Sequence, residues 1–165
     1  MSLDYWHLSI ATVQLALRSH GYENKPSGTA EFKFRVGKDW YYVYCGQLPR
    51  LYIQRFVDVA DYLGDYTSEQ LLSVFQSVNS RLSLVKVCME DVHVVRFTLC
   101  LHEDRYLVFK EKLVEYIREL DDAVESFRMA AILLREEEKE ELMKDYIDRM
   151  MNAEDDMYKV KRLQS

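Results

Sequence analysis

The sequence predicts an α+β domain, with an antiparallel sheet of about five strands and helices packed on one of its faces. One observation is the run 105–134, whose apolar residues recur every three or four positions while charged residues fill the opposite side, as in an amphipathic helix. The other is a set of short segments before it in which apolar and polar residues alternate, as in half-buried strands. A helix of this length would extend ~45 Å, so we expect it to lie on the sheet.

The first half of the chain predicts one helix and three strands. A helical spacing of apolar residues covers about 5–20, and Gly21 is well placed to end it. The segment 24–30 contains Pro26 and Gly28 and is expected to be a loop. Three antiparallel strands, each separated by a short turn, are then expected at 32–36, 40–45 and 51–59.

The second half predicts a helix, a hairpin and the long helix. After a connector at 61–66, Thr67 or Ser68 can cap a helix over 68–82. Strands are expected at 84–89 and 92–101, with Glu90 and Asp91 at the turn between them. The order is therefore helix, three strands, helix, two strands, long helix.

Beyond Leu134 the sequence predicts a C-terminal extension. The acidic run 136–141 interrupts the apolar stripe, a second amphipathic segment follows at about 140–152, and a charged tail, expected to fray, covers 153–165. No Pro or Gly forces a break, which favours continuity with a shift of face, but a bend stays open. We therefore expect one domain at 5–134 and a helical extension with a tail at 135–165.

Composition restricts the class of protein. The chain has 165 residues, of which 48% are hydrophobic, and a net charge of −6, which argues against nucleic acid and an anionic membrane surface as partners. No apolar run is long enough for a transmembrane helix, and no secretory signal is apparent. Three cysteines then suggest a cytoplasmic protein with reduced thiols that serve as small core residues.

The block Leu71–Leu120 holds a helix ending in Val78-Asn79, a short hairpin and a helix entered soon after Leu101. With the element order, this block resembles the YbjN-type family, often labelled candidate bacterial sensory transduction regulators. That family is similar in fold to class I type III secretion chaperones. The resemblance implies a convex sheet with helices on one side, a homodimer and a role in binding another protein. It offers no catalytic residue to carry over.

No pattern of residues predicts catalysis, a cofactor or a metal site. His93, His102, Cys88 and Cys100 lack the tight ligand pairs that are typical of zinc sites. Glycine-rich phosphate loops and a nucleophile elbow are missing from the sequence, and the acidic run 136–141 is most simply a solvated face. The sequence thus predicts no enzyme, no cofactor and no metal.

The function favoured is a non-enzymatic protein-binding module, chaperone-like or regulatory, acting as a homodimer, whose apolar surface and strand edges are expected to accept a segment of a partner. Aromatic residues at 40–44 could form a nucleic-acid stacking platform, but core or dimer packing is favoured because few basic residues accompany them. One alternative is a small-ligand binder or enzyme with a pocket between sheet and long helix, and another is a self-associating structural protein. The residues expected to contact a protein partner are Tyr42, Tyr44, Ile53, Phe56, Met143, Tyr146, Ile147 and Met150.

Overall fold

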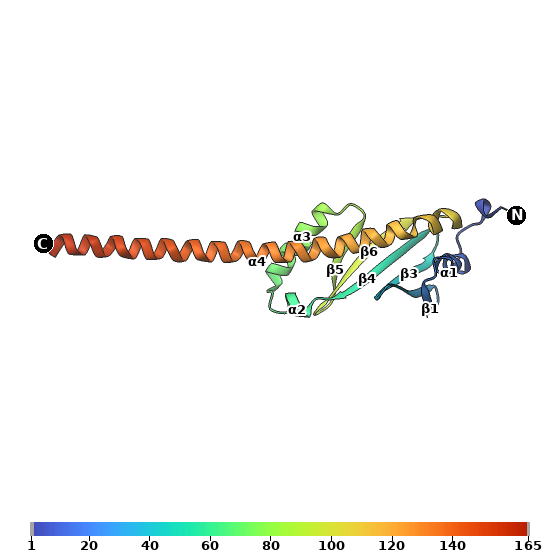
Figure 1. The fold of residues 1–165 in the computed structure, drawn as a ribbon, viewed down its shortest axis with the longest axis horizontal. Coiled ribbons are helices and arrows are strands. Elements are labelled where there is room, and N and C mark those ends of the chain that lie inside the picture. Colours follow the sequence, from blue (N-terminus) through green and yellow to red (C-terminus); the bar gives the residue numbers. More distant parts are fainter. Residues whose placement is uncertain (1, 165) are drawn as a thin grey trace.

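The computed structural model describes residues 2–164 and consists of one antiparallel sheet, helices packed on it, and a long helix that extends far beyond it (Figure 1). The six strands are arranged in the order β1-β2-β3-β4-β6-β5. The elements are η1 Leu3–Tyr5, α1 Ile10–Ser19, β1 Glu23–Gly28, β2 Glu31–Val36, β3 Asp39–Gln47, β4 Arg50–Asp58, α2 Ala60–Leu63, α3 Ser68–Arg81, β5 Val85–Asp91, β6 Val94–His102 and α4 Tyr106–Gln164.

The sheet has one buried face and one open face, as its alternating sequence predicts. The buried side chains of β2, β3, β4 and β6 fall at alternating positions along each strand, and the side chains between them remain at least partly exposed. On the buried face, Phe34, Tyr41 and Phe97 meet apolar residues of α1 and α4 in one core. The α+β class, with helices on one face of an antiparallel sheet, is confirmed.

The sheet has six strands, one more than expected. The prediction of a loop at 24–30 is wrong, because most of this segment belongs to a strand. Glu23–Gly28 forms β1, which pairs with β2 only and is therefore an edge strand. Its side chains are nearly all exposed, so the segment lacks the apolar alternation by which the other strands are identified. Pro26 is tolerated there because one side of an edge strand needs no ladder hydrogen bonds.

The first helix begins later than expected, at Ile10 rather than near residue 5. Ser9 caps it through a hydrogen bond from the backbone of Thr12 to its hydroxyl. The residues before Ser9 pair instead with the start of α4: Leu8 donates its backbone N–H to Asp104 over 2.7 Å, and Trp6 packs on Tyr106. This long-range pairing prevails over the local helical spacing.

Helix α3 agrees with its predicted range, and the hairpin after it is shifted slightly. Thr67 and Gln70 form the reciprocal capping box at the start of α3. The strand β5 continues to Asp91, so the turn falls at Val92 and His93 instead of at Glu90 and Asp91.

Helix α4 is a single helix of 59 residues, continuous through the acidic run 136–141 (Figure 1). Its buried residues follow the predicted stripe and end at Ala131. From residue 139 onward every described side chain is exposed, yet the chain stays helical to Gln164, so the expectation of a frayed tail from 153 is wrong for the described residues. A domain boundary near 135 remains a prediction.

Candidate functional site: the open face of the sheet

Five aromatic side chains lie on the open face of the sheet, on its two central strands. They are Trp40, Tyr42 and Tyr44 of β3 and Tyr52 and Phe56 of β4, and all are partly exposed. The strand register sets them side by side, since Tyr44 is opposite Tyr52 and Tyr42 is opposite Gln54, next to Phe56. We call these five residues the aromatic face.

The rings of the aromatic face support one another. Tyr42 and Phe56 meet edge to face with 5.3 Å between ring centroids, and Tyr44 and Tyr52 lie tilted at 6.3 Å. Gly46 has no side chain, and a Cβ atom there would collide with the Tyr44 ring. Four of the five rings are thus packed in pairs on the sheet.

One corner of the aromatic face is basic. The Lys33 ammonium lies 4.5 Å from the centroid of the Trp40 ring, Lys25 lies at 5.4 Å, and the Arg35 guanidinium lies at 5.6 Å. Arg35 also forms an exposed ion pair of 2.6 Å with Glu23. Sequence reasoning missed this corner because Lys25 lies on β1, which the sequence predicts to be a loop.

Ile53 does not belong to this face, and its place in the expected partner surface is corrected. It is fully buried on the helix-covered side of β4, opposite Val43 of β3. Successive residues of a strand point to opposite faces, so Ile53 and Phe56 cannot share one. Tyr42, Tyr44 and Phe56 do lie together on the open face.

The other four residues expected to contact a partner lie on the part of α4 that extends away from the sheet (Figure 1); they are Met143, Tyr146, Ile147 and Met150. They are all exposed; the exposed fraction runs from 48% for Ile147 to 61% for Tyr146. The structure therefore does not bring them together with the aromatic face. The two groups form separate surfaces.

The edges of the sheet are poorly suited to receiving another strand, contrary to the expectation that they accept a segment of a partner. At the β5 edge, the Asn79 side chain from α3 donates to the Val87 carbonyl oxygen and accepts from the Val87 N–H, each at 2.9 Å. These are the backbone groups that an added strand would use. At the β1 edge, Pro26 has no N–H to offer.

Replacing Asn79 with alanine is expected to lower the free energy of unfolding by about 1–3 kcal/mol, because the Val87 backbone loses both partners at a partly buried position. Urea unfolding measures the change, and hydrogen exchange at the Val87 amide locates it. Ser80→Ala, one residue further along α3, is the control and should change stability little. An unaltered exchange rate at Val87 would contradict the role assigned to Asn79.

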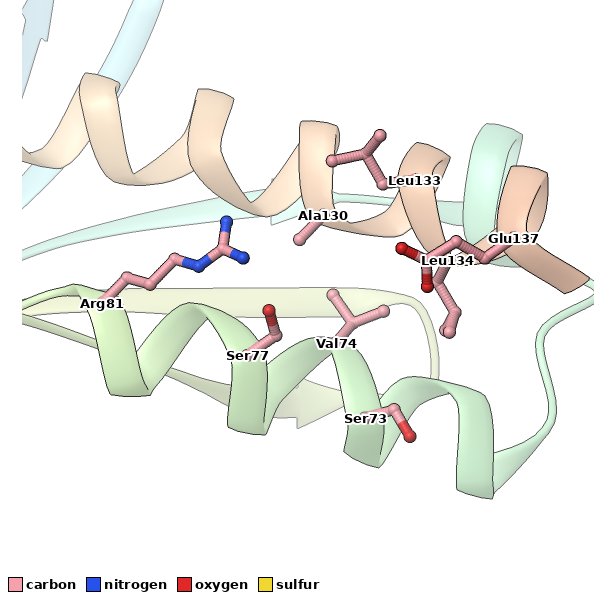
Figure 2. A pocket seen from close by; sticks show the side chains of 8 residues that line it. All are labelled: Ser73, Val74, Ser77, Arg81, Ala130, Leu133, Leu134 and Glu137. Atoms are coloured by element: carbon pink, nitrogen blue, oxygen red, sulfur yellow. The ribbon is translucent and has the colours of Figure 1, made fainter.

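A shallow groove separates α3 from α4 and was not expected from the sequence. Its two adjoining cavities have volumes of about 160 and 280 Å³. Figure 2 shows Ser73, Ser77 and Arg81 of α3 on one side and Ala130 and Leu133 of α4 on the other. The small side chains of Ser77 and Ala130 leave this space, but each cavity is smaller than a usual small-ligand site.

The space between the sheet and α4, where a ligand pocket was one alternative, is filled by core side chains. Phe97 of β6 and Phe109, Leu113 and Phe127 of α4 are fully buried there. Tyr41 reaches the edge of this layer and donates to Asp121 at 2.5 Å, and burial with this bond raises the pKa of its hydroxyl. Arg55 binds the same carboxylate at 2.7 Å, so Asp121 links β3, β4 and α4.

The cysteines and histidines do not gather into a recognisable centre. Burial raises the pKa of the Cys45 thiol to about 11, as expected for an inert core thiol, but Cys100 is exposed and Cys88 half-buried, so the expectation of core cysteines is wrong for Cys100. Among the described residues, no three His, Cys, Asp or Glu side chains lie close enough to hold a metal ion. None of the helices between residues 2 and 164 has the length and apolar character needed to cross a membrane.

Comparison with known proteins shows likeness of fold alone. No protein-family model and no curated protein sequence matches the chain. An uncharacterised protein from Methanothermobacter thermautotrophicus superposes with a TM-score of 0.55 at 13% identity, over 79% of this chain and 99% of that chain. YbjN from E. coli, described as a proposed transcription regulator, gives a TM-score of 0.48 at 11% identity, over 79% of this chain and 94% of that chain.

Proposed function

We propose that the protein is a non-enzymatic protein-binding module, chaperone-like or regulatory, which acts as a homodimer. The observation that carries this proposal is the aromatic face on the open side of the sheet. Tyr and Trp are enriched where proteins bind one another, since they bring much apolar area with few rotatable bonds. Rings that are already packed together also lose little conformational entropy when a partner covers them.

The partner we propose is an extended protein segment that combines apolar anchors with acidic residues. Its apolar side chains would pack on Tyr42 and Phe56, and its carboxylates would face Lys25 and Lys33 at the basic corner. At the β5 edge the Asn79 side chain already occupies the backbone groups of Val87, and at the β1 edge Pro26 has no N–H. Both observations argue for contact with the face of the sheet and against addition of a strand at its edge.

The proposal is tested by selecting displayed random peptides on the full chain. Selected peptides should share aromatic or aliphatic residues next to Asp or Glu. Their dissociation constants should rise roughly tenfold or more in the variant carrying Tyr42→Thr and Phe56→Thr, because central aromatic residues carry most of the energy of such interfaces. Threonine keeps the strand preference of both positions.

Leu72→Gln is the matched control, because Leu72 is an exposed apolar residue on α3 with 57% of its surface accessible. Peptides that bind the control and the Tyr42/Phe56 variant equally well would contradict the proposal. A chain that selects no peptides and instead binds single-stranded oligonucleotides through Trp40 would also overturn it, in favour of the nucleic-acid platform.

A further inference from the structure

The C-terminal part of α4 carries an apolar surface that nothing in the described chain covers. More than one third of the surface of each large apolar side chain here is accessible; these residues are Leu142, Met143, Tyr146, Ile147, Met150, Met151, Met157, Tyr158, Val160 and Leu163. Isolated exposed apolar residues are common, but a concentration of this kind on one free helix marks a contact surface.

Five of these residues, together with Ala153, have the spacing of a coiled coil. Met143, Met150 and Met157 recur every seven residues, and Tyr146, Ala153 and Val160 follow each of them by three. These are the a and d positions of three successive heptads, whose 3.5-residue period differs from the 3.6-residue period of a single helix on a sheet. The same register continues upstream to Met129 and Ile132, which are also exposed.

Residues on both sides of this seam complement a second, parallel copy of the same helix. In a parallel in-register coil, the g residue of one helix lies near the e residue five positions further along the other helix. Within residues 2–164, Arg149, Glu154, Asp156 and Lys161 form no ion pair with another side chain. The three g–e pairs would be Leu142–Ile147, Arg149–Glu154 and Asp156–Lys161, one apolar and two of opposite charge.

We propose that residues 142–163 form a parallel, in-register, two-stranded coiled coil with a second copy of this chain. The inference rests on the homodimer of the proposed function and assigns it a surface, an orientation and a register. Each coil contact occurs twice because the two helices are related by a two-fold axis. The coil leaves the aromatic faces of both copies free for their partners.

An antiparallel coil on the same seam agrees less well with the charges. With Met143 opposite Val160, residues in e positions would face one another, which places Ile147 beside Glu154. Arg149 and Asp156, both in g positions, would then attract each other across the interface, and Lys161 would lie near Glu140, upstream of residues 142–163, but Glu154 would have no opposite charge beside it. Complementary charges on both sides are obtained in the parallel arrangement.

The upstream limit of the coil is set by charge. Glu136 and Lys139 occupy the a and d positions of the heptad before Met143, and they form an ion pair of 3.5 Å within one helix. In an in-register coil each would meet its own copy across the axis, and like charges in a core layer are unfavourable. The close contact therefore begins after Lys139.

A charge reversal and two alternative rescues test the proposal in the full chain. Sedimentation equilibrium over a concentration series should give a dimer for the natural sequence. Arg149→Glu should raise the dissociation constant roughly tenfold, because two symmetry-related attractions become repulsions. Adding Glu154→Arg should restore the natural value, and adding Asp156→Arg should not, because that change sets a second positive charge against Lys161 of the other copy.

Each alternative result identifies what is wrong. Restoration by Asp156→Arg and not by Glu154→Arg would overturn the parallel orientation in favour of the antiparallel one. A dimer that Arg149→Glu leaves unchanged would overturn the coil and keep the homodimer. A chain that remains monomeric at all concentrations would overturn both the coil and the homodimer. Peptide binding by the aromatic face would still be decided by its own experiment.

Disulfide formation gives a second, independent measurement of orientation. With Cys100→Ser as the background, Val160→Cys should form an interchain disulfide on mild oxidation, because equivalent d residues face each other in a parallel coil. Tyr158→Cys, two positions away and off the seam, is the control and should oxidise much more slowly. Equal rates for the two cysteines would contradict the register.

Discussion

Replacing Phe127 with alanine is expected to lower the free energy of unfolding by about 3–5 kcal/mol, the largest single-residue effect we expect in this chain. Phe127 is fully buried where three elements meet. Its ring lies 5.8 Å from Phe97 of β6, edge to face, and 5.5 Å from Phe75 of α3. Alanine would leave a cavity that rigid neighbours on a sheet and two helices cannot close, so contacts are lost in addition to apolar burial.

Urea unfolding followed by circular dichroism, at one protein concentration, measures this loss. Phe127→Leu should cost clearly less than Phe127→Ala because it keeps most of the buried volume. Tyr158→Ala, on the exposed part of the same helix, is the control and should change stability by no more than about 0.5 kcal/mol. A loss below about 1 kcal/mol for Phe127→Ala would show that α3, α4 and the sheet do not unfold together at this position.

The long helix shows which of its features the apolar periodicity of the sequence can predict. The apolar stripe predicted in the run 105–134 is buried from Phe109 to Ala131 and half-buried at Leu134, because a helix that lies on a core must repeat its apolar residues every three or four positions. The end of the helix could not be predicted in the same way. Beyond Glu138 every described side chain is exposed, so no core shapes the pattern, and the heptad spacing that follows has another period.

The sheet shows what a single-strand pattern leaves undetermined. Alternation identified β2, β4, β5 and β6, and aromatic and β-branched residues on both faces identified β3, but β1 has no buried side chains and so leaves no apolar signal. Tyr42, Tyr44 and Phe56 were predicted as contact residues from their aromatic character. Their grouping with Ile53 failed because Ile53 and Phe56 lie three positions apart in one strand and so point to opposite faces, whereas which of the two faces the helices cover depends on tertiary packing.

The hydrogen bonds between Asn79 and Val87 and the groove between α3 and α4 are further features without a sequence signal. The sequence marks Asn79 only as the end of a helix, whereas its side-chain amide forms hydrogen bonds with the backbone N–H and carbonyl oxygen of Val87, eight residues later. The groove depends on small residues of α3 and α4 that lie more than fifty positions apart in the chain. Both arise from the docking of α3, which local patterns do not specify.

Ending the chain after Lys139 is expected to abolish self-association and leave the domain folded. The described side chains beyond this residue are all exposed, so their removal exposes no core. Stability should therefore change by no more than about 0.5 kcal/mol at low protein concentration, where dimerisation adds little to the stability of the full chain. Light scattering and urea unfolding measure the two effects on the same samples.

A chain ending after Leu134 is the sharper comparison, because the domain still holds α4 beyond that point. This shorter chain loses the ion pair of 2.5 Å between Arg135 and Asp65 and the hydrogen bond of 2.6 Å from Gln70 to Glu138. Its new C-terminus would also fray the helical turn that contains Ala131, whose carbonyl oxygen accepts a hydrogen bond from the Tyr66 hydroxyl. We expect it to be about 1–2 kcal/mol less stable than the chain ending after Lys139. If the chain ending after Lys139 were itself unfolded, α4 would be one structural unit from Tyr106 to Gln164, and a domain boundary near 135 would be wrong.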